Sequence, residues 1–167
     1  MNGQTKKRHL KLQIVWDRIV IVWNRIVMVK GCNAVEMKKA GYSNASQLLG
    51  MNITFADRKA GIIEATFDTK ESFQNTVGNI QGGILVAMLD DLMGYALGIT
   101  LPDTQFAPTA NMNVSFLRPV SSGNVSGKGL ILKNIESVFH LSSKLYNADG
   151  EIVASATARA KLGNKTR

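Results

Sequence analysis

Residues 75–98 have the sequence NTVGNIQGGILVAMLDDLMGYALG, in which a polar, glycine-containing loop leads into a long apolar stretch. From Ile84 onward the apolar residues recur at helical spacing, which predicts a long helix ending at Gly98 or Ile99. The Gly82-Gly83 pair would begin this helix, where unpaired backbone N–H groups lie at the positive end of the helix dipole. Such an end can bind a phosphate, a carboxylate or a polarised carbonyl oxygen. One face would be apolar and buried, with Leu85, Met88, Leu89, Leu92 and Ala96.

Two adjacent acids, Asp90 and Asp91, interrupt the apolar stretch. An unpaired carboxylate is costly to bury, so an acid on an apolar helix indicates a functional site. The alternative is that Asp90 is a satisfied buried acid or lies at a solvated edge. We interpret Asp90 as the functional acid and Asp91 as a structural or interface acid. At about 100° per residue, the stripe of Asp90 contains Gly83, Ala87, Gly94 and Leu97, and that of Asp91 contains Ile84, Met88 and Tyr95.

The position of Asp90 along the helix has a consequence for assembly. Asp90 lies nine residues after Gln81, which is about 13 Å along a helix axis. Asp90 therefore cannot act on a carbonyl group held at the N-terminus of its own helix. If both groups serve one reaction, Asp90 must face the helix start of a second subunit. The spacing predicts a symmetric dimer with sites shared between subunits.

Several motifs at fixed offsets resemble the hotdog-fold acyl-CoA thioesterases, a group that includes the hydroxybenzoyl-CoA and phenylacetate-pathway enzymes. The resemblance covers roughly residues 42–162. It departs from the family at Gln81, where His-Gly-Gly is usual; glutamine can donate a hydrogen bond but does not titrate near neutral pH. The matching residues are Asn75, Gln81-Gly82-Gly83, Asp90, Leu101-Pro102, Thr109 to Pro119, Gly123, and Asp149-Gly150 ahead of Ile152 to Thr157.

The resemblance implies hydrolysis of acyl-CoA thioesters to the free acid and CoA, with no cofactor, by a homodimer or homotetramer. In such an enzyme the Gly83 N–H polarises the thioester carbonyl, and Asp90 of the partner subunit attacks it or activates a water. Asn75 orients the water or the carboxylate, and Gln81 contacts the thioester region. Gly82, Thr109 and Arg118 are implied to bind substrate.

Simpler roles remain for some of these residues. Asn75 can be a turn-former and Thr109 a strand-start residue. Arg118 and Lys133 can meet CoA phosphates or be solvated residues at strand ends. Met88, Met93, Tyr95, Leu97 and Phe106 can line an acyl tunnel or simply belong to the core.

Two other functions use the same fold. A hotdog protein can bind acyl-CoA or acyl-carrier protein without hydrolysis, and the glutamine at position 81 is compatible with that loss. An enoyl-CoA hydratase needs a histidine paired with an acid, and His140 is its only candidate in the domain. We rank the hydratase last.

The periodicity outside the central helix predicts an α+β domain. Ser43 or Asn44 would begin a short helix to Leu49, ended by Gly50. Strands are expected at 51–56 and 61–67 before the central helix and at 109–117, 124–132, 137–146 and 152–161 after it. Small apolar residues alternate with polar ones in the last of these, so one sheet face should pack on the helix. The expected fold is an antiparallel sheet wrapped around one helix.

The positive charge is concentrated outside this domain. The net charge is +8, but residues 1–41 hold nine Lys/Arg against two Asp/Glu, and the remainder is nearly balanced. We expect a basic extension (1–41), a domain (42–162) with no electrostatic reason to bind nucleic acid, and a basic tail (163–167). In the extension, residues 14–20 and 21–27 are copies that differ only by Asp17 and Asn24. We interpret this as a short tandem duplication upstream of the natural start, with a basic membrane-surface segment as the alternative.

The remaining composition excludes several classes. Asp17, Arg18 and Arg25 interrupt any membrane span in the extension. The one cysteine, Cys32, excludes an internal disulfide and fits a reducing, cytoplasmic compartment. His9 and His140 have no partner at metal-ligand spacing, so no metal site is expected.

Overall fold

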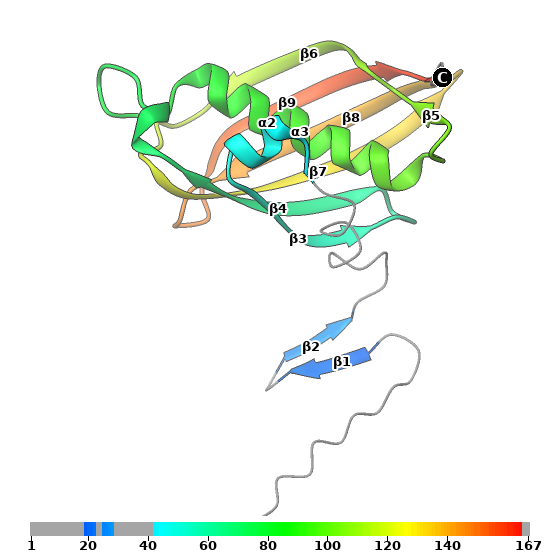
Figure 1. Ribbon diagram of the computed structural model, residues 1–167, viewed down its shortest axis with the longest axis horizontal. Coiled ribbons are helices and arrows are strands. Elements are labelled where there is room, and N and C mark those ends of the chain that lie inside the picture. Colours follow the sequence, from blue (N-terminus) through cyan, green and yellow to red (C-terminus); the bar gives the residue numbers. More distant parts are fainter. Residues whose placement is uncertain (1–18, 23–24, 29–41, 165–167) are drawn as a thin grey trace, which may run out of the picture. The chain divides into compact units, whose positions relative to one another are not determined.

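The computed structural model describes residues 19–22, 25–28 and 42–164, in two units within 1–30 and 31–167 (Figure 1). In the first unit, β1 (Ile19–Val22) and β2 (Arg25–Met28) pair antiparallel, with Ile19 opposite Met28. Both strands come from the duplicated segment. The interpretations of the rest of the extension, including Cys32 and the start of the natural protein, lie outside the described residues.

The second unit is built on a six-stranded antiparallel sheet in the order β3-β4-β7-β8-β9-β6. Figure 1 shows β6 at one edge and β3 at the other, with one long helix across the sheet. A separate two-stranded pair joins β5 (Gln105–Phe106) to β10 (Gly163–Asn164). The strands of the large sheet are β3 (Met51–Asp57), β4 (Ile62–Thr69), β6 (Thr109–Phe116), β7 (Gly123–Ile135), β8 (Val138–Tyr146) and β9 (Ile152–Lys161).

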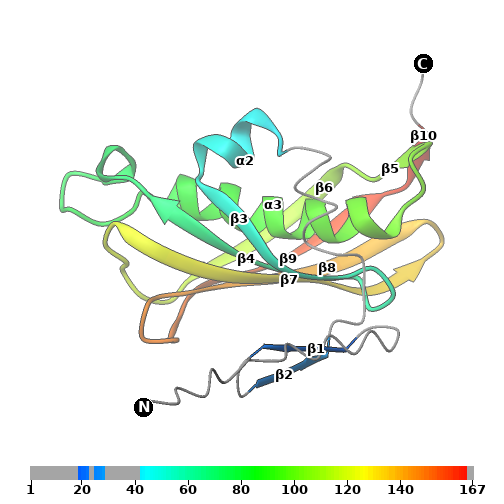
Figure 2. The ribbon, with the colours of Figure 1, turned by 60° about the horizontal axis from the view of Figure 1, so that its bottom comes forward.

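The central helix α3 (Gly82–Thr100) packs its apolar face on the sheet (Figure 2). All five residues predicted for that face are buried, with Leu89 and Leu92 fully inaccessible. Two glycines of β7 allow the close approach: a Cβ at Gly129 would overlap the backbone of Leu92, and one at Gly127 would meet its side chain. The helix is long and apolar enough to span a membrane by length and composition, and its burial against the sheet accounts for that composition.

A short helix, α2 (Asn44–Leu48), precedes the sheet as predicted. Ser43 caps it by accepting a hydrogen bond from the Ser46 N–H at 3.1 Å. Gly50 ends it with φ +68, where a Cβ would lie 2.6 Å from the carbonyl oxygen of Asp68. The alternation predicted for the last strand is also confirmed, because Ala154, Ala156 and Ala158 are buried.

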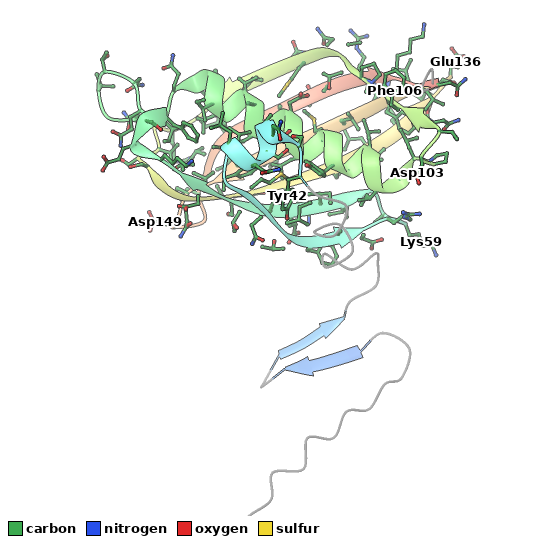
Figure 3. All side chains as sticks on the ribbon, in the orientation of Figure 1. Tyr42, Lys59, Asp103, Phe106, Glu136 and Asp149 are labelled. Carbon is green, nitrogen blue, oxygen red and sulfur yellow. The ribbon has the colours of Figure 1, made fainter. Side chains whose placement is uncertain are left out.

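The predicted strands are all present, with small differences at their ends. Ser137, expected to begin a strand, instead lies in a turn: Glu136 (φ 50) and Ser137 (φ 68) form a two-residue link between β7 and β8. Figure 3 labels Glu136 in this turn and Asp149 in the turn between β8 and β9. β1, β2, β5, β10 and the 3₁₀ turn η1 (Glu71–Phe73) were not predicted from the sequence, because these elements are too short to show periodicity.

Candidate active site

A hollow opens beside the N-terminus of α3. Its volume is about 510 Å³. Two of the predicted site residues, Asn75 and Gln81, line it together. The full lining is Ser72, Phe73, Gln74, Asn75, Thr76, Gln81 and Ile84.

The start of α3 carries unpaired backbone donors next to this hollow, although Gly82 and Gly83 themselves do not line it. Gln81 is the N-cap residue, and its carbonyl accepts from the N–H of Ile84 at 2.9 Å and of Leu85 at 3.3 Å. Among the described residues, no acceptor takes a hydrogen bond from the N–H of Gly82 or Gly83. These are the unpaired donors that a helix N-terminus leaves. They lie where they can bind a carbonyl oxygen or its oxyanion.

The two glycines differ in how crowded they are. A Cβ at Gly82 would lie 3.3 Å from the ring of Phe116 on β6, whereas a Cβ at Gly83 would meet nothing within 4 Å. A ligand can therefore approach Gly83 more closely than Gly82. Phe116 was not identified from the sequence as a neighbour of the site, because its contact with Gly82 depends on the packing of β6 against α3.

Asn75 forms the loop that leads to the helix. Its side-chain Oδ1 accepts from the N–H of Val77 at 3.0 Å and from the N–H of Asn79 at 3.1 Å. Its backbone N–H donates to the carbonyl of Asn79 at 2.7 Å. The turn-forming role considered from the sequence is thus present. The Nδ2 group has no partner among the described residues, so it remains as a donor toward the hollow.

Asp90 lies further along the helix and pairs with the first residue of β6. The Thr109 hydroxyl donates a 2.8 Å hydrogen bond to Asp90 Oδ1. Thr109 therefore begins the strand, as its simpler role required, and also fixes the orientation of the carboxylate. The sequence analysis placed both residues in the site but did not predict this bond.

Within one chain, the predicted site residues at the start of α3 lie apart from Asp90 and Thr109. Asp90 is seven residues beyond Gly83, which corresponds to about 10 Å along the helix axis. Asp90 does not line the hollow at the helix start. Two positions of the stripe of Asp90 are open: apart from the backbone of the helix itself, no described atom lies within 4 Å of a Cβ built at Gly83 or Gly94.

Comparison with known proteins identifies the family. A family model described as the thioesterase superfamily matches residues 77–154. A phenylacetic acid degradation-related protein from Ralstonia eutropha, described as a proposed thioesterase, is 34% identical. The match covers 77% of this chain and 99% of that protein, with a TM-score of 0.70. The chain belongs to the thioesterase superfamily.

Two further matches are more distant. A proposed esterase from Saccharolobus solfataricus is 24% identical over 110 residues, which cover 66% of this chain and 76% of that protein. A Streptococcus mutans protein, solved bound to acetyl-CoA, shares the fold with a TM-score of 0.62 at 17% identity; 70% of this chain and 91% of that one are covered. The hotdog fold predicted from the motifs is confirmed.

In this superfamily member, Asp91 points away from the stripe of Asp90. Its carboxylate lies near Ser46 of α2, whose hydroxyl influences its titration. Tyr95 donates to the hydroxyl of the same serine at 3.1 Å, and Ser46 is fully buried. Asp91 Oδ2 is buried without a hydrogen-bond partner in the described part of the chain. This placement fits the structural role assigned to Asp91, and Ser46 was missed because nothing in the sequence marks a buried serine.

The environment of Asp91 shifts its titration. Burial raises the pKa of its carboxyl above the ordinary value of 3.8. The nearby Ser46 hydroxyl lowers this pKa in part, and the neighbouring charge of Asp90 raises it. Asp91 therefore loses its proton less readily in the folded protein than a carboxyl group does in water.

The remaining candidates lie apart from the Asp90–Thr109 pair. Arg118 follows β6, where its Nη1 donates to the carbonyl of Ile152 at 2.9 Å and its Nε lies 3.4 Å from a carboxylate oxygen of Glu151. His140 is on β8 opposite Lys133 and Arg159, so no acid neighbours it across the strands as a hydratase would need. Among the described residues no group of three or more His, Cys, Asp or Glu side chains is placed to hold a metal ion.

Proposed function

We propose that this member of the thioesterase superfamily hydrolyses acyl-CoA thioesters to the free acid and CoA. The observation that carries the proposal is the pair of half-sites on one helix. Its N-terminus offers the free N–H groups of Gly82 and Gly83, and the oriented carboxylate of Asp90 lies on the same stripe. In support, the Streptococcus mutans relative binds acetyl-CoA.

Binding would begin at the helix N-terminus. The thioester carbonyl oxygen accepts a hydrogen bond from the Gly83 N–H and lies at the positive end of the helix dipole. The negative charge that develops on this oxygen as the carbonyl carbon becomes tetrahedral is stabilised there. The hollow lined by Asn75 and Gln81 would hold the group next to the thioester. Both side chains remain neutral, so they position the substrate and do not take its proton.

Asp90 of the partner subunit would supply the base or the nucleophile. As a base, it takes a proton from a water molecule while the water oxygen attacks the carbonyl carbon. The tetrahedral intermediate then collapses, the C–S bond breaks, and the CoA thiolate leaves and is protonated. As a nucleophile, Asp90 attacks the carbonyl carbon, the C–S bond breaks and the CoA thiolate leaves and is protonated; water then hydrolyses the resulting mixed anhydride to the free acid and Asp90. In either case the Thr109 bond to Oδ1 leaves Oδ2 to face the reaction.

The axial separation of Asp90 from Gly83 makes the dimer part of the proposal. A two-fold axis that sets two α3 helices against each other brings each Asp90 toward the other subunit's helix start, so one dimer holds two sites. The small residues of the stripe allow close helix approach. Further assembly to a tetramer is compatible with this site, and a cytoplasmic location remains our expectation.

The first test is thiol release from a panel of short, medium, long and aryl acyl-CoAs. We expect Asp90→Asn to lower kcat by roughly 10²–10⁴-fold, the usual contribution of a positioned general base. Asp68→Asn is the matched control, because Asp68 is exposed on β4 and does not line the hollow; it should leave kcat unchanged. Binding of acyl-CoA without hydrolysis by either protein would instead favour the non-hydrolytic binding protein. Activity that survives in Asp90→Asn would remove Asp90 from the mechanism.

Sharing of sites between subunits can be tested separately. Asp90→Asn and Gly83→Val should each be inactive alone, since the second places a branched side chain in the open space at the helix start. Hybrid dimers formed by co-expression contain one doubly altered and one intact site. The co-expressed mixture, which contains these hybrids together with the two inactive parental dimers, should recover up to about a quarter of wild-type activity. No recovery from a mixture shown to contain hybrids would contradict a shared site.

A further inference from the structure

The sheet face turned away from α3 carries an uneven charge distribution. The cross-strand register identifies its outward positions, because side chains that face the helix are buried and their neighbours are not. On β7, β8 and β9 these positions hold five cationic side chains and no carboxylate. The outward acids Asp57, Glu64 and Asp68 lie on β3 and β4. The cations are Lys128, Lys133, Lys144, Arg159 and Lys161.

A hollow of about 280 Å³ lies within this basic half of the face. We call it the outer hollow. It sits on the row in which Asn111, Arg159, His140 and Lys133 are opposite one another on four adjacent strands. This row lies toward the end of the sheet that Glu136 marks in Figure 3. The residues that line the outer hollow are Asn111, Asn113, Leu132, His140, Leu141, Thr157, Ala158 and Arg159.

Donor groups dominate the outer hollow. Arg159 forms neither an ion pair nor a side-chain hydrogen bond with any described residue. The only side-chain bond within the hollow runs from Asn113 Nδ2 to Asn111 Oδ1 at 3.2 Å, which leaves Asn111 Nδ2 as a donor. The Thr157 hydroxyl and one His140 ring N–H add two more. Glu136, in the turn beyond the end of β7, is the nearest acid along these strands.

We propose that the outer hollow binds an oxyanion, a phosphate or carboxylate group of a small molecule, on the face of the sheet opposite the thioesterase site. The planar guanidinium of Arg159 matches the two oxygens of such a group. The volume exceeds that of a bare phosphate, and Leu132 supplies an apolar wall for the part of the molecule that carries the anion. Lys133, Lys144 and Lys161 on the same face raise the local concentration of anions, whereas Lys128 is paired with Glu64 at 2.8 Å. A metal cation is excluded as the ligand by the absence of carboxylates among the lining residues.

Binding can be measured directly on the full chain. The side-chain amide signals of Asn111 and Asn113 in a ¹H–¹⁵N spectrum would be followed during titration with inorganic phosphate, pyrophosphate or acetate at constant ionic strength. We expect saturable shifts of both amides with at least one of these anions. The absence of saturable shifts with all three would overturn the proposal.

Two variants distinguish a defined site from diffuse surface charge. Arg159→Gln should weaken anion binding by about tenfold or more. Lys161→Gln removes the same charge from the same strand and face, two residues away and outside the hollow lining, so it should change binding by less than about twofold. Equal weakening in both variants would refute a specific pocket. A lower assembly mass in Arg159→Gln would instead identify the hollow as a contact between copies of the chain and also overturn the proposal.

Competition between ligands would show which molecule carries the oxyanion. If the group belongs to CoA, adenosine 3′,5′-bisphosphate should displace phosphate, and Arg159→Gln should raise KM for acyl-CoA with kcat unchanged. If it belongs to a separate metabolite, the bisphosphate should not compete and KM should be unaltered. Both results keep the site and differ only in its ligand. The binding measurement does not depend on hydrolysis, so it stands whether or not the proposed thioesterase activity is found.

Discussion

Thr109 on β6 donates a 2.8 Å hydrogen bond to Asp90 Oδ1 on α3. This bond links the edge strand of the sheet to the central helix at the proposed catalytic carboxylate. Hydrogen bonds to charged groups contribute about 1.5–3 kcal/mol, enough to select one orientation of the acid. The mechanism therefore depends on a strand residue that does not itself react.

The first prediction concerns that hydroxyl. Thr109→Val keeps the shape of the side chain but removes the donor, so kcat for thioester hydrolysis should fall by roughly tenfold or more while the fold is retained. Thr109→Ser keeps the hydroxyl and should restore most of the loss. Kinetics with a single acyl-CoA and circular dichroism of each variant would check this. Equal kcat for valine and threonine at this position would show that the bond does not orient a catalytic group.

The central helix was predictable because its signals are local. Leu85, Met88 and Leu92 repeat at helical spacing and are buried as that spacing requires. The strands of 8–13 residues after it were found for the same reason, since alternation needs several residues to be recognised. β5 and β10, with two residues each, carry no such pattern, and only their pairing in the fold defines them.

The site was predictable only in its separate parts. Glycine at the helix start and an acid inside an apolar helix are visible in the chain itself. The bond between Thr109 and Asp90 joins residues 19 positions apart, and the contact of Phe116 with Gly82 joins two elements; neither has a sequence signal. The same is true of the row formed by Asn111, Arg159 and His140, because strand register is set by the whole sheet.

The second prediction separates two roles of Asn75. Its Oδ1 holds the loop through the N–H groups of Val77 and Asn79, while its Nδ2 has no partner among the described residues and is proposed to contact the substrate. Asn75→Asp keeps the acceptor and removes the donor, so the melting temperature should change little and kcat/KM should fall. Asn75→Ala removes both and should also lower stability by about 1 kcal/mol. If the aspartate variant hydrolyses substrate at the wild-type rate, Asn75 acts only as a turn residue.

The third prediction follows from the raised pKa of Asp91. A pKa higher in the folded than in the unfolded state means that the native protein binds the proton more tightly. Ionisation of Asp91 therefore destabilises the fold as pH rises from the unfolded value near 3.8 through the raised folded value, and the full penalty applies above it. Asp91→Asn should be more stable than wild type at neutral pH, with no advantage at low pH.

Urea unfolding at several pH values would measure this difference. The gain in unfolding free energy from Asp91→Asn should grow with pH and then level off. Asp103→Asn is the control, because Asp103 is exposed and its substitution should give a small difference that does not vary with pH. An Asp91→Asn advantage that is the same at all pH values would point to packing or hydrogen bonding in place of ionisation.

The fourth prediction concerns Gln81, which caps α3 through its backbone and makes no side-chain cap bond. Its amide cannot titrate, so the pH profile of wild-type hydrolysis should contain no step from this position. Gln81→His places an imidazole at the hollow without removing any observed bond, and the fold should be unaffected. Because an unperturbed imidazole titrates at about pH 6.5, the variant's kcat/KM should gain an inflection in that region. Gln81→Asn, which is also neutral, should leave the pH profile unchanged. An inflection in Gln81→Asn, or no inflection in Gln81→His, would show that the side chain at position 81 does not contact the reacting thioester.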